Sequence, residues 1–571
     1  MKPAARLRRR DCPELANDWP DAVPALLRRV YASRGAHGLA SAQPKLAHLL
    51  PPDALGGLDD AIALLAGAIA DGRHIVVVGD FDCDGATACA VGVRGLRMLG
   101  ATRVSHAVPN RMVHGYGLSP ALVEELAALV PELIVTVDHG IACHAGIAAA
   151  KARGWQVLVT DHHLPGDALP PADAIVNPNC RGDGFASKCL AGVGVMFYVL
   201  LALRRHLRAA GCPQAAQADL TVLLDLVAVG TVADLVPLDA NNRALVSAGL
   251  RRLRAGQGCA GLRALIQVSR RDVRTLSAGD IGFSIAPRLN AAGRLEDMGL
   301  GIECLLTDDA TQAREIAELL DEINTSRRAV QAQMTDDAQA ALGRIALDGD
   351  VPVALCLFDA DWHPGVVGLV ASKMKERLHR PVIAFAPSES GSTMLRGSAR
   401  SIPGYHVRDA LAAVHAQLPG CIDRFGGHAM AAGLSLRLDQ LEAFRDAFTG
   451  HALRMLTPEL LQLDVLTDGA LDAHEFTRDH ATCLRDGGPW GQAFPEPQFD
   501  GEFDVARWRV IKDRHLKLEL RDGPLRVDAI EFNGWSGTPP PARVRIAYRL
   551  EPDDYRGGDA VQLVVVHREP A

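Results

Sequence analysis

The chain has 571 residues, of which 48% are hydrophobic, and its formal net charge at pH 7 is -8. A chain of this size and composition has enough apolar residues for the cores of about two to four domains, which excludes an intrinsically disordered protein. The acidic balance argues against a uniformly basic nucleic-acid binder, but it leaves room for a local basic groove.

The first 70 residues differ in pattern from the segment that follows. They carry Pro, Arg and short apolar runs and end in a helical pattern over Leu58–Ala70, so we expect an N-terminal helical cap. From residue 74 onward, strand-like and helix-like runs alternate. The strand-like runs are 75–79, 103–108, 133–137, 157–160 and 174–176, and the helix-like runs are 86–99, 120–130 and 142–153. This alternation predicts an α/β domain at 71–305, with a parallel sheet covered by helices on both faces.

The first strand-like run leads into an acidic loop. The β-branched run 75–78 is followed at 79–85 by three alternating carboxylates, Asp80, Asp82 and Asp84. At about 5 Å and an effective dielectric constant near 20, two carboxylates repel each other by roughly 3 kcal/mol. Three of them cannot lie together ionised without cations or strong donors, so the loop predicts a metal site.

Three other interpretations of this loop compete with a metal site of that kind. An EF-hand calcium loop also begins Asp-x-Asp-x-Asp-Gly, but it needs a helix before it and a Glu at the twelfth position, where this chain has Val91. Haloacid-dehalogenase-type phosphatases place Thr or Val two residues beyond the second Asp, where this chain has Asp84 or Ala86. A turn that caps a helix beginning near Ala86 stays open from the loop alone.

Polar residues also follow later apolar runs. Leu133–Val137 leads into Asp138-His139-Gly140, and 157–160 leads into Asp161-His162-His163. The carboxyl ends of parallel strands meet at one edge of a sheet, where sites of this class lie. Asp and His without Cys suit Mn²⁺ or Mg²⁺ better than structural zinc. Farther along, Asp234 ends an apolar helical run, where a lone buried carboxylate is costly and requires a cation.

In their order and spacing, these motifs resemble those of the DHH phosphoesterase superfamily, and within it the bacterial single-strand-specific 5′→3′ exonucleases. The motifs are Gly79-Asp80-Phe81-Asp82-Cys83-Asp84-Gly85, Val137-Asp138-His139-Gly140, Asp161-His162-His163 and Gly230-Thr231-Val232-Ala233-Asp234. The resemblance covers nearly the whole chain from about residue 70. It implies a site for two Mn²⁺ or Mg²⁺ ions.

The resemblance also implies a role for each site residue. The implied metal ligands are Asp82, Asp84, Asp138, His162 and Asp234, with Asp138 bridging both ions and Asp80 as a further ligand or a residue behind them. His163 matches a position near the scissile phosphate, and Asp161 is expected to orient its neighbours. Phe81 stands where Tyr is usual, and His139 where Cys or Asn is more common. Neither change removes a ligand, and the role of His139 as a metal contact or proton donor stays open.

The second half of the chain fits the same resemblance. A charged helix over Ala310–Leu347 looks like the connector between two lobes (306–349), and 350–455 resembles the smaller α/β DHH-associated domain. Glycines there let backbone amides approach phosphate, and a helix opening near Gly365 offers its positive N-terminus to an anion. The candidate substrate-binding residues are Arg111, Arg288, Asn290, Arg294, Ser398, Arg400 and His428.

The last segment, 456–571, has the alternating pattern of a β-barrel. Runs at 503–511, 516–520, 527–532 and 544–550 match the oligonucleotide-binding (OB) fold that the resemblance implies. Trp490, Trp508 and His515 are candidates for stacking on bases, although Trp in a small barrel is more often part of the core.

The implied activity is hydrolysis of the phosphodiester next to the 5′ end of single-stranded DNA, releasing mononucleotides during recombination and repair. Smaller relatives that cleave short oligonucleotides or cyclic dinucleotides, and a non-catalytic replication scaffold, are the alternatives. Chain length and the barrel disfavour the first alternative, and intact ligand positions disfavour the second.

Partners and compartment follow from the same resemblance and from composition. Besides single-stranded DNA, the resemblance implies a single-stranded-DNA-binding protein and a RecQ-type helicase. No window approaches about 18 uncharged apolar residues, the Arg-rich start leads into polar sequence, and the 12 cysteines include no C-x-x-C pair. We therefore expect a cytoplasmic monomer without membrane contact, zinc finger or disulfide framework.

Overall fold

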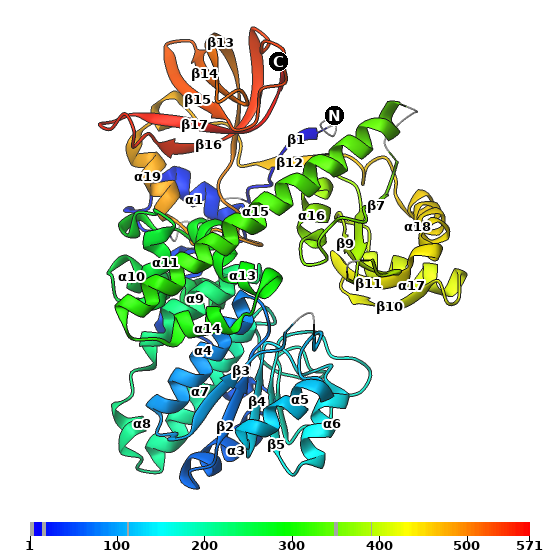
Figure 1. The fold of residues 1–571 in the computed structure, drawn as a ribbon. Coiled ribbons are helices and arrows are strands. Elements are labelled where there is room, and N and C mark those ends of the chain that lie inside the picture. Colours follow the sequence, from blue (N-terminus) through cyan, green and yellow to red (C-terminus); the bar gives the residue numbers. More distant parts are fainter. Residues whose placement is uncertain (1–4, 14–18, 111–112, 348–351, 390) are drawn as a thin grey trace. The chain divides into compact units, whose positions relative to one another are not determined.

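The computed structural model describes residues 5–13, 19–110, 113–347, 352–389 and 391–571 (Figure 1). The chain forms two compact units. The larger unit combines Arg9–Asn324 with Thr467–Ala571, and the smaller unit combines Thr325–Leu466 with the start of the chain. Among the described helices, none has both the length and the apolar composition that a membrane span requires.

The larger unit contains a parallel sheet of order β3-β2-β4-β5-β6. Its strands are β2 (Ile75–Val78), β3 (Val104–Ala107), β4 (Leu133–Val137), β5 (Gln156–Thr160) and β6 (Ala174–Val176). Helices α4 (Cys83–Met98) and α7 (Gly192–Ala209) pack on one face, and α5 (Pro120–Leu126) and α6 (His144–Ala152) on the other. The predicted parallel sheet between two helical layers is confirmed.

Each strand serves two hydrophobic cores because successive side chains point to opposite faces. Ile75, Val77 and Val135 belong to the core that includes α4 and α7, whereas Val76 and Ile134 belong to the core that includes α5 and α6. All four residues of β2 and all five of β4 are buried. A strand buried on both faces has to be apolar throughout, so the first polar residues appear only where the strand ends.

A helical layer completes this part of the unit. It consists of α3 (Leu58–Ala70), α8 (Pro213–Gln217), α9 (Leu224–Ala233), α10 (Ala240–Arg254), α11 (Ala260–Val268) and α14 (Gly299–Leu306). A continuous helical run joins α12 (Ala278–Asp280), a π-helical turn over Ile281–Ile285 and α13 (Ala286–Leu295). The predicted long helix is present as α15 (Ala310–Leu347).

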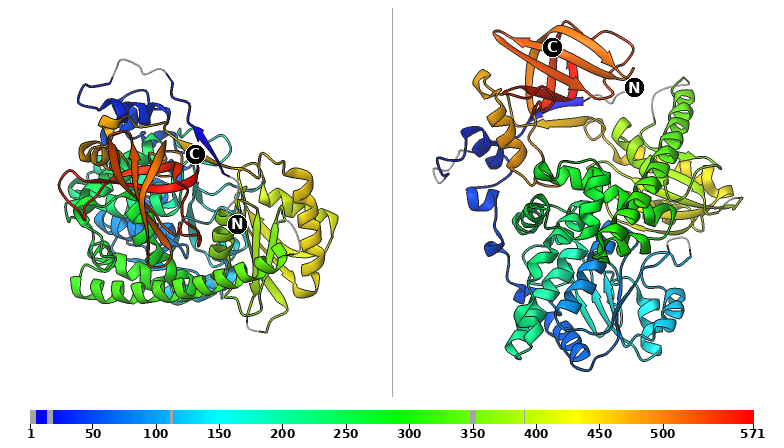
Figure 2. Two further views of the ribbon diagram at one scale, coloured as in Figure 1. Left: turned by 90° about the horizontal axis from the view of Figure 1, so that it is seen from above. Right: turned by 60° about the vertical axis from the view of Figure 1, so that its left-hand side comes forward.

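The C-terminal strands close into a barrel of order β13-β14-β15-β17-β16, the five-stranded architecture of an OB fold (Figure 2). They are β13 (Phe499–Ile511), β14 (His515–Asp522), β15 (Leu525–Glu531), β16 (Arg543–Pro552) and β17 (Val561–Pro570). The barrel core residues Phe499, Phe503 and Tyr548 belong to the same hydrophobic core as the parallel sheet. The barrel therefore shares its hydrophobic core with the rest of the larger unit.

Segments from both ends of the chain meet beside the barrel. The hydroxyl of Tyr31 in α1 (Ala25–Ala32) donates to the carbonyl of Gly487 (2.7 Å), next to α19 (Arg478–Asp486). Arg34 and Asp468 form a fully buried ion pair at 2.8 Å. Trp490 stacks on Phe494 and donates from Nε1 to the carbonyl of Leu484, so this Trp packs internally rather than offering a surface to bases.

The N-terminal segment also contains a strand, β1 (Ala5–Arg9), paired with β12 (Leu463–Thr467).

The smaller unit is built on a mixed sheet of order β10-β11-β9-β8-β7. Its strands are β7 (Leu355–Phe358), β8 (Val382–Pro387), β9 (Met394–Arg400), β10 (Ile422–Gly427) and β11 (Ala431–Arg437), and its helices are α16 (Val367–Leu378), α17 (Val407–Gln417) and α18 (Leu441–Met455). The predicted second α/β fold is confirmed.

Candidate metal centre

Side chains from three strand ends and one helix end converge in the larger unit. Asp80, Asp82 and Asp84 follow β2, Asp138 follows β4, Asp161, His162 and His163 follow β5, and Asp234 caps α9. Nε2 of His162 lies 3.1 Å from Oδ1 of Asp138 and 3.5 Å from Oδ2 of Asp234. Three groups have ligand atoms within 4.8 Å of one another: Asp138 with His162 and His163, Asp84 with His162 and Asp234, and Asp80 with Asp82 and Asp138. The strand ends that sequence patterns placed at one edge do meet.

The acidic loop is both a helix cap and a carboxylate cluster. Oδ1 of Asp82 accepts a hydrogen bond from the N–H of Gly85 (3.0 Å), so Asp82 caps α4, which begins at Cys83 rather than near Ala86. Asp84 accepts hydrogen bonds from the N–H groups of Gly192 (2.7 Å) and Val193 (3.0 Å) at the start of α7. The capping interpretation and the metal interpretation of the loop therefore describe two uses of the same residues.

Asp138 adopts an uncommon backbone conformation. Its φ of 65° lies in the left-handed region, which non-glycine residues adopt rarely and at a cost of about 1–3 kcal/mol. Its side chain is buried, and its Oδ1 lies 3.1 Å from Nε2 of His162, among the clustered ligand atoms. A buried carboxylate oxygen with this environment fits a site for a cation.

Helix α13 holds the acidic loop from outside the sheet. Oδ1 of Asn290 accepts a hydrogen bond from the N–H of Cys83 (2.9 Å). A Cβ at position 293 would lie 1.9 Å from the carbonyl oxygen of Phe81, so only glycine permits this approach. Asn290, predicted to bind substrate, thus uses its carbonyl oxygen to position the loop.

Burial and mutual repulsion raise the pKa values of the clustered carboxylates. Burial and the charge of Asp82 raise the pKa of Asp84 to about 7. Burial and the charge of Asp84 also raise the pKa of Asp138 and of Asp234. Ionising all three together requires compensating positive charge, and an all-oxygen and imidazole donor set without thiolates is suited to Mn²⁺ or Mg²⁺. The donor set therefore fits hard divalent ions.

Asp161 and His163 form an ion pair beside the cluster. Nδ1 of His163 lies 2.8 Å from Oδ1 of Asp161, and the N–H groups of Ile141, His162 and His163 donate to the same carboxylate. Burial alone would raise the pKa of Asp161, but His163 and these amides outweigh it and hold that pKa below its ordinary range. Although burial opposes it, Asp161 raises the pKa of His163 to about 9, which keeps the imidazole charged at neutral pH.

His139 has a packing role. Its ring is fully buried, Nε2 lies 3.1 Å from the carbonyl oxygen of Val78, and Nδ1 faces the thiol of Cys143 at 4.0 Å. A ring nitrogen facing a carbonyl has to donate, so Nε2 carries the proton. Burial lowers the pKa of His139 to about 4, so the ring is neutral and braces β2 rather than supplying a proton.

Tyr116 lies at the site although it is not among the predicted site residues; the sequence indicates only its turn, Gly115-Tyr116-Gly117, after the strand-like run 103–108. Its ring is 48% exposed and lies edge-on to Phe81 (5.9 Å between centroids) and His163 (6.1 Å). It comes from a turn between Gly115 and Gly117, both with positive φ. Two glycines around an aromatic residue were the available signal.

The predicted substrate-binding residues of the larger unit differ in their surroundings. Arg288 contacts the carbonyl of Ser284 and forms an ion pair with Asp321 at 2.7 Å. Arg294 lies half-buried near the end of α13. Arg111 lies outside the described residues. Arg288 therefore already has a carboxylate partner inside its own unit.

The other predicted substrate-binding residues gather at one end of the sheet in the smaller unit. Nη1 of Arg400 donates to Oγ of Ser398 (3.0 Å), and its Nε donates to Oγ of Ser372 in α16 (3.2 Å). Arg400 pairs across the sheet with Ala431, and His428 lies exposed in the adjoining turn, where its N–H donates to the carbonyl of Ala431. These residues form one polar cluster.

Divalent metal is expected to stabilise the protein more at about pH 8 than at about pH 5.5. The raised pKa of Asp84 means that, without metal, the folded state binds more protons than the unfolded chain between about pH 4 and pH 7, so stability falls as pH rises through that window. Bound Mn²⁺ removes this penalty and, at about 1,000 times its Kd, adds roughly 4 kcal/mol. Thermal unfolding with EDTA or Mn²⁺ at the two pH values measures the difference.

Two variants control this metal experiment. Asp138→Asn should lose most of the Mn²⁺-induced rise in Tm. Asp225→Asn should keep it, because Asp225 is a buried carboxylate outside the cluster, bonded to the N–H groups of Leu226 and Cys259. A Mn²⁺ effect that is equal at both pH values would contradict the assignment of the cluster as ligands.

Family models match three parts of the chain. The DHH family N-terminal domain matches residues 74–231, the DHHA1 domain matches 350–451, and the RecJ OB domain matches 467–567. The first segment holds the metal cluster except for Asp234, the second holds the Ser398–Arg400 cluster, and the third holds the barrel up to residue 567.

Curated relatives and solved structures match over the full length. The single-stranded-DNA-specific exonuclease RecJ of Dickeya dadantii is 49% identical, with 100% of each chain covered, and that of Escherichia coli is 47% identical, with 99% of each covered. The crystal structure of RecJ from Thermus thermophilus in complex with Mn²⁺ matches with a TM-score of 0.80 at 31% identity, covering 100% of this chain and 80% of that one.

Proposed function

The chain belongs to the RecJ family of the DHH phosphoesterase superfamily, and from this premise we propose that it is a single-stranded-DNA-specific exonuclease that releases 5′-mononucleotides by metal-dependent hydrolysis. The observation that carries the proposal is the convergence of buried and half-buried carboxylates with two half-buried imidazoles around Asp138, with no thiolate among them. Such a donor set has little reason to persist in a binding module, because burying it costs stability.

We propose that Asp82, Asp84, Asp138, His162 and Asp234 hold two ions, with Asp80 beside them. When bound, such ions polarise a phosphodiester, lower the pKa of water and neutralise charge on the leaving oxygen. Asp138 is central because its oxygens belong to two of the three ligand groups. The backbone amides at the start of α7 donate to both oxygens of Asp84 and fix its carboxylate beside His162 and Asp234.

His163 is proposed to act on the scissile phosphate. Asp161 engages its Nδ1, so Nε2 is the ring atom that approaches a phosphate oxygen. The raised pKa of His163, about 9, supports a charged donor there at neutral pH. Asp161 is a positioning residue because it acts through His163.

The polar cluster of the smaller unit is proposed to bind the terminal nucleotide. Ser398, Arg400 and His428 present hydroxyl, guanidinium and imidazole groups at one sheet end, and guanidinium matches phosphate geometry. We propose five parts for the chain. The DHH domain (71–305) carries the catalytic site, a connecting helix follows (306–349), and the DHH-associated domain (350–455) binds the substrate. The OB-fold domain (456–571) binds nucleic acid, and the N-terminal segment (1–70) forms a cap.

Polarity and strand selectivity are tested together. A single-stranded oligonucleotide labelled at either end, with Mn²⁺ or Mg²⁺, should release labelled mononucleotide first from the 5′ label, and the same sequence as a duplex should resist. Release that begins at the 3′ label, or activity restricted to dinucleotides, would overturn the proposal in favour of a different phosphodiesterase. No release from any substrate with ligands intact would favour a scaffold.

An exposed aromatic pair makes the barrel testable by point substitution. Trp508 is 42% exposed and stacks on Trp535 at 5.6 Å, and Phe532, which follows the end of β15, is 57% exposed. Base stacking contributes about 1–3 kcal/mol per base, so Trp508→Ala should weaken binding of a long oligothymidylate by roughly 5- to 150-fold. Val566→Ala, an exposed apolar residue on β17, is the control. Fluorescence anisotropy measures Kd, and equal affinity in both variants would refute a role for Trp508.

Deleting the barrel tests its role in DNA binding less cleanly than a point substitution does. Removal of the C-terminal segment should weaken binding and flatten its salt dependence, by about 0.7 in slope for each phosphate that the shortened protein no longer neutralises. Because Phe499 and Phe503 belong to the core of the larger unit, the truncation also opens that core. Point substitutions separate binding from folding.

We propose that a RecQ-type helicase and a single-stranded-DNA-binding protein supply the unwound strand, since the barrel and the polar cluster engage only a strand that is already single. We also propose that the enzyme acts in the cytoplasm, because its proposed substrate is chromosomal DNA under repair, and that it acts as a monomer.

A further inference from the structure

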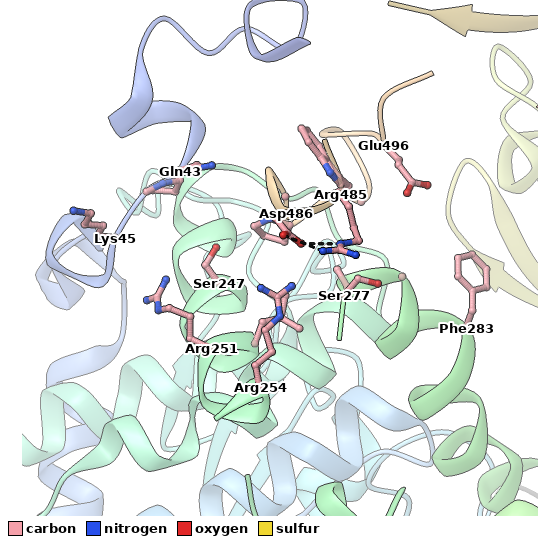
Figure 3. Close-up of a pocket in the computed structure, with 18 residues that line it drawn as sticks. Gln43, Lys45, Ser247, Arg251, Arg254, Ser277, Phe283, Arg485, Asp486 and Glu496 are labelled. Carbon is pink, nitrogen blue, oxygen red and sulfur yellow. Dashed lines mark hydrogen bonds and ion pairs between the residues drawn. The ribbon is translucent and has the colours of Figure 1, made fainter. Parts of the chain in front are cut away.

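A polar cavity lies in the larger unit, apart from the metal cluster (Figure 3). Its volume is about 470 Å³. Four stretches of chain line it: 43–45, the end of α10 from 247 to 254, the start of the helical run from 277 to 283, and the segment 485–496 that leads to the barrel. None of the residues assigned to metal, phosphate or terminal nucleotide lies in this cavity.

The cavity has an excess of positive charge. Its cations are Lys45, Arg251, Arg254 and Arg485, and its carboxylates are Asp486 and Glu496. Asp486 is paired with Arg485 at 3.0 Å, and Glu496 is paired with Arg549. Across the described part of the chain, no carboxylate forms an ion pair with Lys45, Arg251 or Arg254. Three cations are therefore left to face a ligand.

One of these cations is fixed in place. Nε of Arg254 donates to the carbonyl of Leu276 at 2.7 Å, and burial lowers the pKa of this guanidinium without discharging it. Figure 3 shows the guanidinium groups of Arg251 and Arg254 pointing into the cavity. A guanidinium held in this way loses little freedom when it binds an anion.

An exposed aromatic ring stands at the rim. Phe283 is 88% exposed and belongs to the π-helical turn Ile281–Ile285. π-Helical turns are rare and occur often at functional sites. In Figure 3 Phe283 stands on the far side of the cavity from Arg251 and Arg254. A single strand that crosses the cavity would place phosphates against the arginines and a base against the ring.

The cavity is linked to the metal cluster by one helical run. Gly279 lines the cavity, and Asn290 of the same run holds the acidic loop through the N–H of Cys83. Eleven residues separate these positions, which corresponds to roughly 17 Å along a helix at 1.5 Å per residue. A strand whose end lies at the metal cluster reaches the cavity only after several nucleotides.

We propose that this cavity binds backbone phosphates of single-stranded DNA downstream of the nucleotide being cleaved, with Arg251 and Arg254 as the phosphate contacts and Phe283 as a stacking surface. The inference rests on the proposed exonuclease function, because it assigns the cavity to the same substrate. A phosphodiester chain suits three spaced cations and an aromatic rim better than an acidic peptide does, because its bases can stack on the exposed ring of Phe283.

The test compares a long and a short substrate. Oligothymidylates of about 20 and about three nucleotides are hydrolysed by the wild type, by Arg251→Ala and by the double variant Arg251→Ala/Arg254→Ala; the longer one exceeds a single OB-fold site of about 4–16 nucleotides. We expect KM for the long strand to rise about tenfold more than KM for the short one. The salt slope of long-strand binding should fall by about 0.7 for each arginine removed, or roughly 1.4 in the double variant.

Controls make each outcome decisive. Arg208→Ala removes an exposed arginine at the end of α7 that lies outside the cavity and should leave the ratio of the two KM values unchanged. Arg254 is held by the carbonyl of Leu276 and not by Arg251, so the single variant Arg251→Ala remains informative if the double variant unfolds. Equal effects on both substrates, or none, would overturn the proposal.

Two further results would distinguish a DNA-binding cavity from a protein-docking site and from a failure of the proposed exonuclease function. If a labelled oligo-aspartate peptide binds the wild type and not Arg251→Ala, while DNA binding is unchanged, the cavity is a protein-docking site and the proposal fails. If the wild type hydrolyses neither oligothymidylate, the exonuclease function fails first, independently of the cavity.

Discussion

Asp138→Asn is expected to lower kcat by at least about 1,000-fold. The substitution keeps the size of the side chain and removes the charge shared by two ligand groups. Metal ions supply several kcal/mol to phosphoryl transfer, and each 1.4 kcal/mol is a factor of about ten in rate. Steady-state release of mononucleotide from a 5′-labelled strand measures the effect.

Binding should respond differently from turnover in this variant. The cation-rich and aromatic surfaces lie elsewhere, so the Kd for an oligothymidylate should stay within about threefold of the wild type, since phosphate contacts dominate affinity. Asp225→Asn, the buried carboxylate outside the cluster, should retain turnover. Substantial activity in Asp138→Asn would contradict the central place given to Asp138.

Gly230→Ala is expected to damage the metal centre without removing a ligand. A Cβ at this position would lie 2.2 Å from Oγ1 of Thr87 and 2.8 Å from Oδ1 of Asp84. Both atoms belong to the buried start of α4, which cannot move far, because Thr87 donates to the carbonyl of Cys83. We expect a loss of about 1–3 kcal/mol in the free energy of unfolding, as for other overpacked cores, and weaker Mn²⁺ binding.

Gly450→Ala is the matched control. Gly450 is also helical, but a Cβ there would meet only Nη1 of Arg454 at 3.7 Å. Replacing a helical glycine with alanine should then stabilise the protein by up to about 1 kcal/mol. Chemical unfolding gives the stability and isothermal titration gives the Mn²⁺ affinity. Unchanged Mn²⁺ affinity in Gly230→Ala would show that Asp84 tolerates the added methyl group and is not a ligand held by packing.

The sheet and its polar edge were predictable because local patterns determine them. A strand buried on both faces must be apolar, so the runs before Asp80 and Asp138 are recognisable and their ends locate the site. Helix α15 was predictable in the same way from its charged periodic pattern. Fold class is confirmed; the ligand roles and the domain limits stay predictions.

Contacts between distant segments were not predictable from patterns. The hydrogen bond from Cys83 to Asn290 joins residues 207 positions apart, and nothing in either motif specifies it. The two barrel-region tryptophans also differ from each other: Trp490 packs against Phe494, whereas Trp508 is exposed. The alternation of apolar and polar residues indicates that a Trp lies in or near a strand. Whether its side chain is exposed depends on how neighbouring segments pack against that strand.

The two-ion centre can be tested most directly by crystallography of the protein with Mn²⁺, recorded at the manganese absorption edge. We predict two anomalous peaks about 3.5–4 Å apart, the spacing of two-metal sites. Both should contact Asp138, with Asp82, Asp84, His162 and Asp234 completing the ligands. A single peak, or peaks that leave Asp138 uncoordinated, would contradict a two-ion centre built on Asp138.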